Sequence, residues 1–349
     1  MKKFSWVLIL LVVVSLISCP SPSSSSKAWV VSTIAGSTQG FSDSADGTPQ
    51  FDRPSGVAVD SEGNLYVADT SNHRIRKITP AGAVSTLAGS DQAGTANGQG
   101  TSAQFNRPSG VATDSAGNLY VADQENNRIR KIVLATKEVS VIADSSTSGT
   151  ANGQGTSAQF SDPSGVAVDA AGNVYVADTT NNWIRKLALN AEKTSYTVST
   201  FSTGFSWPLG VAVDSAGNLY VADTLNNQIR KITDAGVVST LAGDDTSGHR
   251  DGAGDQARFN RPSGVAVDSS GNVYVADYGN HRIRKIVLAT KEVSTIAGSD
   301  RTLDETITHR DGAGDQARFD RPSGVAVDSS GNVYVADYGN NRIRKIVYQ

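Results

Sequence analysis

The chain has 349 residues, of which 38% are hydrophobic and 7% aromatic, and it contains 34 glycines. This composition is thin for a helical core and favours small β-modules joined by glycine-rich turns. A net charge of −3 excludes an overall basic field, so nucleic acid is not an expected partner. One cysteine and four histidines exclude an intrachain disulfide and a cysteine-based zinc site. No cofactor and no metal are expected.

The N-terminus has the layout of a secretory signal. Lys2 and Lys3 precede an apolar run over residues 4–17, and a Ser/Pro tract follows at residues 20–26. The only cysteine, Cys19, ends the segment Leu-Ile-Ser-Cys, which resembles a bacterial lipobox. The resemblance implies a signal peptide over residues 1–18, lipidation of Cys19 and a Ser-rich linker over residues 19–29. An ordinary secreted protein is the alternative. The expected location is extracytoplasmic, in the cell envelope on the periplasmic or outer surface, with membrane attachment only through the lipid anchor.

The remaining chain, residues 30–349, is built from repeats. The string Pro-Ser-Gly-Val-Ala-Val-Asp at residue 54 returns with small changes at residues 108, 163, 208, 262 and 322. Each copy holds four short runs rich in Val, Ile and Tyr, such as residues 56–60, 65–69, 74–78 and 84–88, bounded by turn residues. Four strands in each of six copies predict an all-β, six-bladed β-propeller.

The two ends of the chain predict how the ring closes. Residues 30–36 read VVSTIAG and match the fourth strand of a later copy, VVSTLAG at residues 237–243. The last copy ends at Gln349 without a fourth strand. The N-terminal strand is therefore expected to complete the C-terminal blade, which removes an exposed sheet edge.

The copies resemble NHL repeats. The frame PSGVAVDxxGNxYVADxxNxRIRKI recurs six times, and Asn72, His73, Arg74 and Ile75 carry the signature. The resemblance implies the propeller fold, but NHL propellers occur in many functional settings, so it does not fix an activity.

The residues common to all copies are interpreted as structural. Asp60 ends the first strand, Asp69 ends the second, and Asn72 follows three residues later. Their counterparts in the other copies have nearly the same surroundings, whereas a catalytic carboxylate pair needs two different pKa values. The arginine of each third strand, Arg76 in the first copy, is expected on a solvated or ion-paired blade surface.

Function is expected where copies differ, on the face that carries the turns between second and third strands and the long inter-blade loops. Trp183 replaces an arginine, Trp207 replaces the residue before the proline, and with Phe205 they suggest an aromatic notch. The alternative is that these aromatic side chains fill space left by a shortened loop. The phenylalanines of the long loops, such as Phe105, are expected to pack between blades. The candidate binding residues are Asn72, His73, Arg74, Arg128, Trp183, Trp207, Tyr278, His281, Arg282, Tyr338 and Arg342.

These observations predict a binding or scaffold module, expected to be a monomer, whose partner is a protein, a peptide or a glycan of the cell envelope. The alternative is a metal-dependent propeller enzyme, a lyase or a lactonase-like hydrolase. A zinc lyase needs about three converging histidines, and no first strand contains His, Glu or Cys. Catalysis is therefore the less favoured prediction, and no catalytic residue is assigned.

Overall fold

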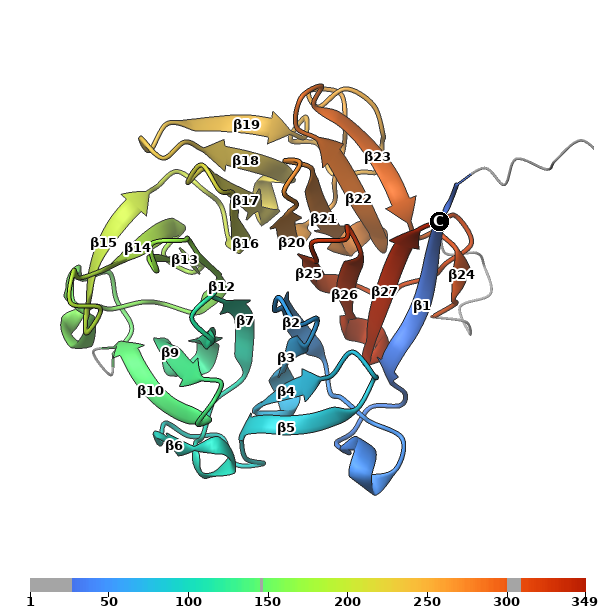
Figure 1. The fold of residues 1–349 in the computed structure, drawn as a ribbon. Coiled ribbons are helices and arrows are strands. Elements are labelled where there is room, and N and C mark those ends of the chain that lie inside the picture. Colours follow the sequence, from blue (N-terminus) through green and yellow to red (C-terminus); the bar gives the residue numbers. More distant parts are fainter. Residues whose placement is uncertain (1–26, 145–146, 300–308) are drawn as a thin grey trace, which may run out of the picture.

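The computed structural model describes residues 27–144, 147–299 and 309–349. Six sheets surround a central axis, and the described residues contain no α-helix (Figure 1). The predicted six-bladed, all-β propeller is confirmed. The signal peptide and Cys19 lie outside the described residues, so their predictions stay untested. No helix among the described residues is long and apolar enough to cross a membrane.

Each blade is an antiparallel sheet whose strands follow the chain from the axis outwards. Blade 1 contains β2 (Pro54–Val59), β3 (Leu65–Asp69), β4 (Arg74–Ile78) and β5 (Val84–Gly89). Blade 2 contains β7 (Pro108–Thr113), β8 (Asn118–Asp123), β9 (Arg128–Val133) and β10 (Glu138–Ala143). Blade 3 contains β12 (Pro163–Val168), β13 (Val174–Asp178), β14 (Trp183–Leu189) and β15 (Tyr196–Ser202). Blade 4 contains β16 (Pro208–Val213), β17 (Leu219–Asp223), β18 (Gln228–Ile232) and β19 (Val238–Ala242). Blade 5 contains β20 (Pro262–Val267), β21 (Val273–Asp277), β22 (Arg282–Val287) and β23 (Glu292–Ala297). Blade 6 contains β25 (Pro322–Val327), β26 (Val333–Asp337), β27 (Arg342–Tyr348) and β1 (Trp29–Gly36).

Short elements lie in the connections. Three two-residue strands extend the outer edges of blades 2, 3 and 6: β6 (Gly98–Gln99), β11 (Gly153–Gln154) and β24 (Gly312–Ala313). The 3₁₀ turns are η1 (Ser44–Asp46), η2 (Thr70–Asn72), η3 (Gly100–Ser102), η4 (Gln124–Asn126), η5 (Gly155–Ser157), η6 (Thr224–Asn226), η7 (Tyr278–Asn280) and η8 (Tyr338–Asn340). Because β6 and β24 lie at the outer edge of the propeller (Figure 1), these parts of the long loops lie against outer strands rather than over the axis.

The predicted closure of the ring is confirmed. Strand β1 pairs antiparallel with β27 from Trp29 opposite Tyr348 to Gly36 opposite Arg342. Val31 is buried in a cluster that includes Ile296 of blade 5 and Ile346 of blade 6. The first and last strands of the chain therefore hold the ring together by backbone hydrogen bonds and by apolar packing.

The first strands approach one another more closely than a side chain would allow. A Cβ atom added to Gly56 would lie 2.3 Å from the carbonyl oxygen of Ser109 in the next blade. The equivalent glycines of the other blades meet the same contact. Glycine in the Pro-Ser-Gly segment therefore sets the narrow radius of the ring.

The ion pairing expected of the third-strand arginines is confirmed, but their expected position on a blade surface is wrong for five of the six blades. Arg76, Arg130, Arg185, Arg284 and Arg344 are completely buried. Each guanidinium forms an ion pair with the aspartate that ends the second strand, over 2.7 to 3.0 Å. It also lies over a buried phenylalanine of the inter-blade loop, as Arg130 does over Phe105 at 5.0 Å. The packing of Phe105 between blades is thus confirmed. The alternation of basic and apolar residues along the third strand did not reveal this burial, because both sides of a propeller blade face another blade.

Candidate functional site

The antiparallel order of the strands sorts the connections onto two faces. The mouth face carries the turns between second and third strands, such as η2, and the connections that enter each first strand, such as Arg53. The hairpin face carries the turns between first and second strands, such as residues 60–64, and between third and fourth strands. The candidate residues from the sequence lie on the mouth face or at strand ends next to it.

A narrow channel of about 100 Å³ follows the axis. Two residues of each first strand line it: Ser55, Gly56, Ser109, Gly110, Ser164, Gly165, Leu209, Gly210, Ser263, Gly264, Ser323 and Gly324. Ser55 Oγ lies 2.6 Å from Thr70 Oγ1, which places the serine ring at the mouth face. The channel is too narrow to admit a peptide or a sugar chain, so such a ligand would contact only the edge of its opening.

A repeated polar network fixes the turns around this rim. Asp69 Oδ1 accepts from the Asp52 amide at 2.8 Å, and its Oδ2 accepts from Asn72 Nδ2 and Arg76 Nη1. Burial raises the pKa of Asp69 to about 6, although Arg76 and these hydrogen bonds act in the opposite direction. Asn72 also donates to the Gly40 carbonyl. Side-chain hydrogen bonds thus hold this turn, in agreement with the structural interpretation of Asp69 and Asn72. The candidate Asn72 uses its amide group inside this network.

The long inter-blade loops form hydrogen bonds with the same buried arginines. Asn97 Oδ1 accepts from Arg130 Nη2 at 2.8 Å, and Asp251 Oδ1 accepts from Arg284 Nη2 at 2.6 Å. The Asn-Gly and Asp-Gly segments of these loops thus hold a guanidinium. Hydrogen bonds therefore join the described parts of these loops to the core of their blades.

The residue before each blade proline has a left-handed backbone. Its φ lies between 50° and 55° in all six blades. Its N–H donates to a side chain of the preceding blade, as Arg107 does to His73 Nδ1 over 3.1 Å. The six residues are Arg53, Arg107, Asp162, Trp207, Arg261 and Arg321, and we call them the rim residues. They display six side chains around the channel in a fixed backbone conformation.

The acceptors of these hydrogen bonds are four asparagines and two histidines. They are His73, Asn127, Asn182, Asn227, His281 and Asn341. Asn Oδ1 and unprotonated His Nδ1 serve the same purpose, and both residue types tolerate the left-handed backbone found at these positions. Burial, followed by the charges of Arg107 and Arg74, lowers the pKa of His73 and favours the neutral ring that this bond requires. The candidates His73 and His281 therefore join blades to one another.

The candidate arginines at the starts of third strands bind neighbouring turns. Arg74 donates to the Asn72 carbonyl, and its guanidinium lies 3.9 Å from the centre of the Phe41 ring. Arg282 and Arg342 donate to the carbonyls of Asn280 and Asn340. Arg128 instead forms an ion pair with Asp144 over 2.8 Å.

The expected aromatic notch is only partly assembled. Phe205 is buried between blades 3 and 4. Trp207 is 43% exposed and Trp183 is half-buried. No ring contact joins the two tryptophans within the part of the chain that the structure describes. The alternative that aromatic side chains fill the space of the shortened loop thus holds for Phe205.

Tyr278 and Tyr338 do lie together. Their ring centres are 6.4 Å apart on neighbouring blades, and both side chains are half-buried. Tyr278 also lines an open depression of about 570 Å³ between blades 4 and 5. Among residues 27–144, 147–299 and 309–349, no three His, Cys, Asp or Glu side chains gather as a metal site would need.

The fold defines the class of protein as a six-bladed β-propeller with a ring of displayed side chains on one face. Its blades are NHL repeats, since the NHL repeat model matches residues 51–78, 105–132, 160–187, 205–232, 259–286 and 319–346. Each match begins at the buried phenylalanine of the inter-blade connection and ends in the third strand.

Comparisons with known proteins agree on the propeller. The chain is 29% identical over 326 residues to Protein SUPPRESSOR OF QUENCHING 1, chloroplastic, from Arabidopsis thaliana. The aligned region covers 88% of this chain and 26% of that protein. It is 29% identical over 337 residues to human NHL repeat-containing protein 2, covering 83% of this chain and 46% of that protein. The chain thus spans less than half the length of these relatives. An auxiliary nutrient binding protein from Bacteroides thetaiotaomicron aligns with a TM-score of 0.69 and 18% identity over 93% of this chain and 77% of that chain.

Sequence reasoning missed most of the rim residues, although a signal was present. Arg-Pro recurs at residues 53, 107, 261 and 321, in register with the repeat. Trp207 stands out in the sequence because it departs from this repetition. Their convergence on one opening depends on the closure of the ring.

Proposed function

We propose that this protein is an exported, lipid-anchored binding module that uses its mouth face to hold a protein, peptide or glycan partner in the cell envelope. The basic start, the apolar run and Cys19 at its end support export and anchoring. The similar propeller from Bacteroides thetaiotaomicron is an auxiliary nutrient binding protein, which is consistent with a binding use of this fold.

The rim residues are the observation that carries the binding proposal. Their backbones are locked by hydrogen bonds of 2.7 to 3.1 Å between blades. Their side chains are not all alike, since four blades have arginine, blade 3 has aspartate and blade 4 has tryptophan. A rigid backbone that displays variable side chains binds a partner at little cost in ordering entropy.

The anchor is tested by replacing Cys19 with alanine. We expect the wild-type protein to sediment with membranes and to carry a lipid-modified N-terminus by mass spectrometry. The Cys19→Ala variant loses the acylated thiol and is expected in the soluble fraction. Equal sedimentation of both forms, without any lipid mass, would contradict lipid anchoring and leave the binding proposal standing.

The binding face is tested with two exposed apolar residues of blade 4. Trp207 lies on the mouth face, whereas Val237, 63% exposed, lies on the hairpin face between β18 and β19. Purified protein is titrated against separated envelope fractions of proteins and glycans. We expect Trp207→Ala to weaken binding by about tenfold, as truncation of a buried aromatic contact does, and Val237→Ala to leave it unchanged. The reverse result would move the binding surface to the hairpin face.

A further inference from the structure

Four of the six rim residues are arginines, and they lie on consecutive blades. Going round the ring, Arg261, Arg321, Arg53 and Arg107 belong to blades 5, 6, 1 and 2. Asp162 and Trp207 occupy blades 3 and 4. The arginines therefore form a crescent of positive charge on one side of the channel mouth, although the whole chain is slightly acidic.

Most of this charge is available to a ligand. Arg53, Arg261 and Arg321 are exposed, and no ion pair engages them within the ranges that the structure describes. Among the described residues only Arg107 of these four forms an ion pair, with Glu125 at 3.5 Å, and both side chains are exposed. Exposed pairs of this kind are weak and exchange readily for another anion.

The acidic side chains beside the crescent have other contacts. Asp52 accepts a hydrogen bond from Gln39 Nε2 at 3.1 Å. Asp320 lies 3.4 Å from His281 Nδ1 and is mostly shielded from solvent. These two carboxylates thus reduce the net positive charge around the crescent, but neither forms an ion pair with Arg53 or with Arg321.

The crescent borders the depression between blades 4 and 5. Its lining includes Leu225, Asn227, Asn260, Arg261, Tyr278 and Arg321. Burial raises the pKa of Tyr278, as do Tyr338 and Asp320, whereas the charges of Arg321 and Arg261 lower it. Leu225 is 50% exposed. Aromatic and apolar surface, amide groups and two cations thus meet in one open site.

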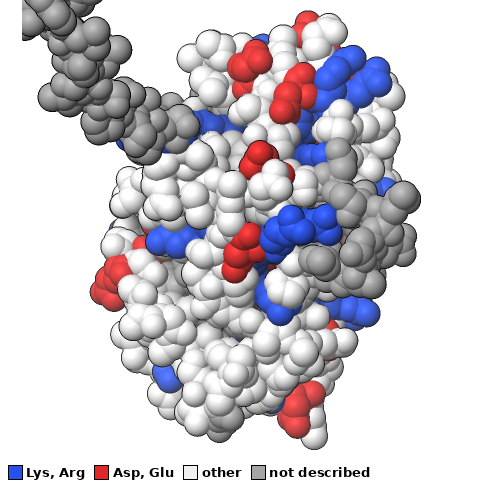
Figure 2. Space-filling model, turned by 90° about the vertical axis from the view of Figure 1, so that its right-hand side faces the viewer, with Lys and Arg blue, Asp and Glu red and all other residues white. Residues whose placement is uncertain are grey.

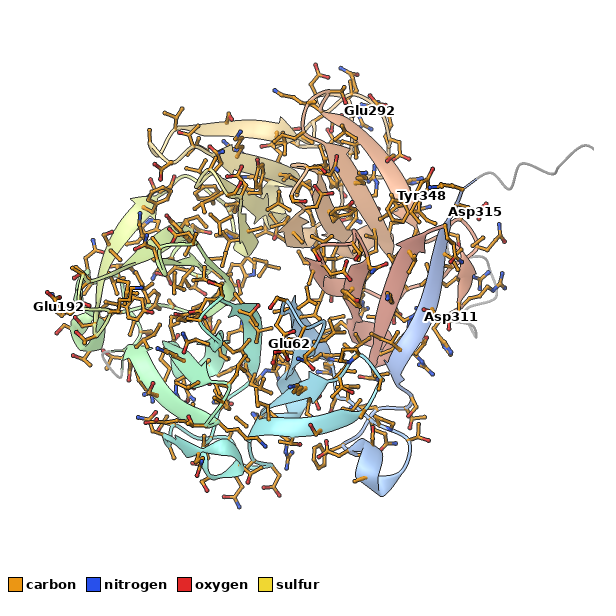
Figure 3. All side chains as sticks on the ribbon, viewed as in Figure 1. Glu62, Glu192, Glu292, Asp311, Asp315 and Tyr348 are labelled. Atoms are coloured by element: carbon orange, nitrogen blue, oxygen red, sulfur yellow. The ribbon has the colours of Figure 1, made fainter. Side chains whose placement is uncertain are left out.

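The hairpin face carries a ring of acidic side chains at the ends of the first strands. An aspartate ends each first strand there, at Asp60, Asp114, Asp169, Asp214, Asp268 and Asp328. Burial raises the pKa of Asp60, but hydrogen bonds from Asn64, Tyr66 and the turn amides outweigh it and lower the pKa overall. Figure 3 shows Glu62 of the same turn beside the central opening, whereas Glu192 and Glu292 lie at the outer edge. On the outer side near β1, positive and negative side chains are interspersed (Figure 2). The four arginines and the six aspartates thus lie at opposite ends of the propeller axis.

We propose that this depression binds an acidic saccharide, a chain of uronate units whose carboxylates pair with Arg261 and Arg321 while a sugar ring packs on Tyr278. The inference rests on the proposed function and names its ligand class. Guanidinium groups bind carboxylates in a bidentate manner, and a phenol ring suits the apolar face of a pyranose. Asn260, which also lines the depression, supplies an amide partner for a hydroxyl group. Arg53 and Arg107 extend the positive path for further units of the chain.

The test uses oligogalacturonate as the probe and its methyl-esterified form as the neutral control. We expect the mature wild-type protein to bind the acid in calorimetric titrations and the ester at least tenfold more weakly. Arg321→Gln and Arg261→Gln are each expected to weaken binding by about tenfold, the usual loss for one charge-assisted pair. The matched control is Lys193→Gln, which removes an exposed charge from the hairpin face and should leave affinity unchanged. Unchanged melting temperatures establish that the variants are folded.

Two further probes decide the ligand class. Polyglutamate carries carboxylates without any sugar, and duplex DNA carries phosphates without uronate units or a pyranose ring; we expect both to bind more weakly and without dependence on Tyr278. If either binds as well as oligogalacturonate, or if Tyr278→Ala leaves saccharide binding unchanged, the saccharide assignment is overturned. If no anionic probe binds while envelope fractions still bind through Trp207, this inference fails and the proposed function stands. If neither binds, both fail.

Discussion

At the scale of single residues, the polar groups of this propeller mostly hold neighbouring blades together. His73 is the clearest example, because the sequence marks it as a signature residue and a possible ligand. In the fold its Nδ1 accepts the amide hydrogen of Arg107 in the next blade. Four blades use asparagine for the same bond, so the chemistry required is an acceptor at that place.

Replacing His73 tests this interpretation. His73→Ala removes the acceptor and leaves the Arg107 amide without its partner, which we expect to cost about 1 to 2 kcal/mol of unfolding free energy. His73→Asn supplies Oδ1, as Asn127 does one blade later, and should stay within about 0.5 kcal/mol of wild type. Chemical denaturation measures both variants. Equal losses in the two would show that ring packing matters and the acceptor does not.

The same bond predicts a dependence on pH. The pKa of His73 is lowered in the fold by burial and by Arg107 and Arg74, with Glu125 opposing. The unfolded chain, with an ordinary histidine pKa near 6.5, therefore binds more protons than the fold does. Stability should fall as the pH drops below about 6.5 and level off below the folded pKa. Melting curves of wild type and His73→Asn between about pH 7 and about pH 5 should diverge, with the variant losing less. Parallel curves would contradict the prediction.

At the scale of strands, the first strand of each blade is set by contact between backbones. The predicted strands at residues 65–69 and 74–78 match β3 and β4, whereas the first strand begins at Pro54, two residues earlier than expected. Alternation of apolar residues does not detect this start, because Ser55 and Gly56 face the channel. Their spacing is decided by the neighbouring blade.

Gly110→Ala tests how tightly the first strands pack. Its Cβ would lie 2.2 Å from the Ser164 carbonyl oxygen, so a strand must move. We expect a loss of about 1 to 3 kcal/mol, as for other overpacked cores. The control is Ser109→Ala in the same strand, which only removes a hydroxyl from the channel lining. Calorimetric unfolding of both distinguishes a steric effect from a general sensitivity of β7, and similar values for the two would refute the steric account.

At the scale of the whole molecule, the propeller is a closed ring with unlike faces. Closure depends on β1, whose partner β27 is the last strand of the chain. The arginine crescent and the aspartate ring lie at opposite ends of the axis. Each blade contributes one position to each ring, so a single repeat unit generates both faces when six copies close.

Removing β1 should open the ring. A protein that begins at residue 37 lacks Val31 and the ladder to β27, and leaves the edge of blade 6 exposed. We expect its melting temperature to fall by about 10 °C or more, since several kcal/mol are lost, and aggregation through the free edge to increase. The control begins at residue 27 and keeps β1. Equal melting temperatures would show that the closing strand is dispensable.

The sequence by itself determined the six repeats, the strands, the closure of the ring and the turn chemistry, because these depend on local spacing and on matching ends. It also pointed to Trp207 as a departure from the repeat and to Tyr278 as a candidate binding residue. Only the tertiary structure decided that Arg76 is buried, that His73 bonds the next blade, and that Arg53 and Arg321 share one opening. Burial and convergence depend on how blades face one another, and residues far apart in the chain become neighbours only after the ring has closed.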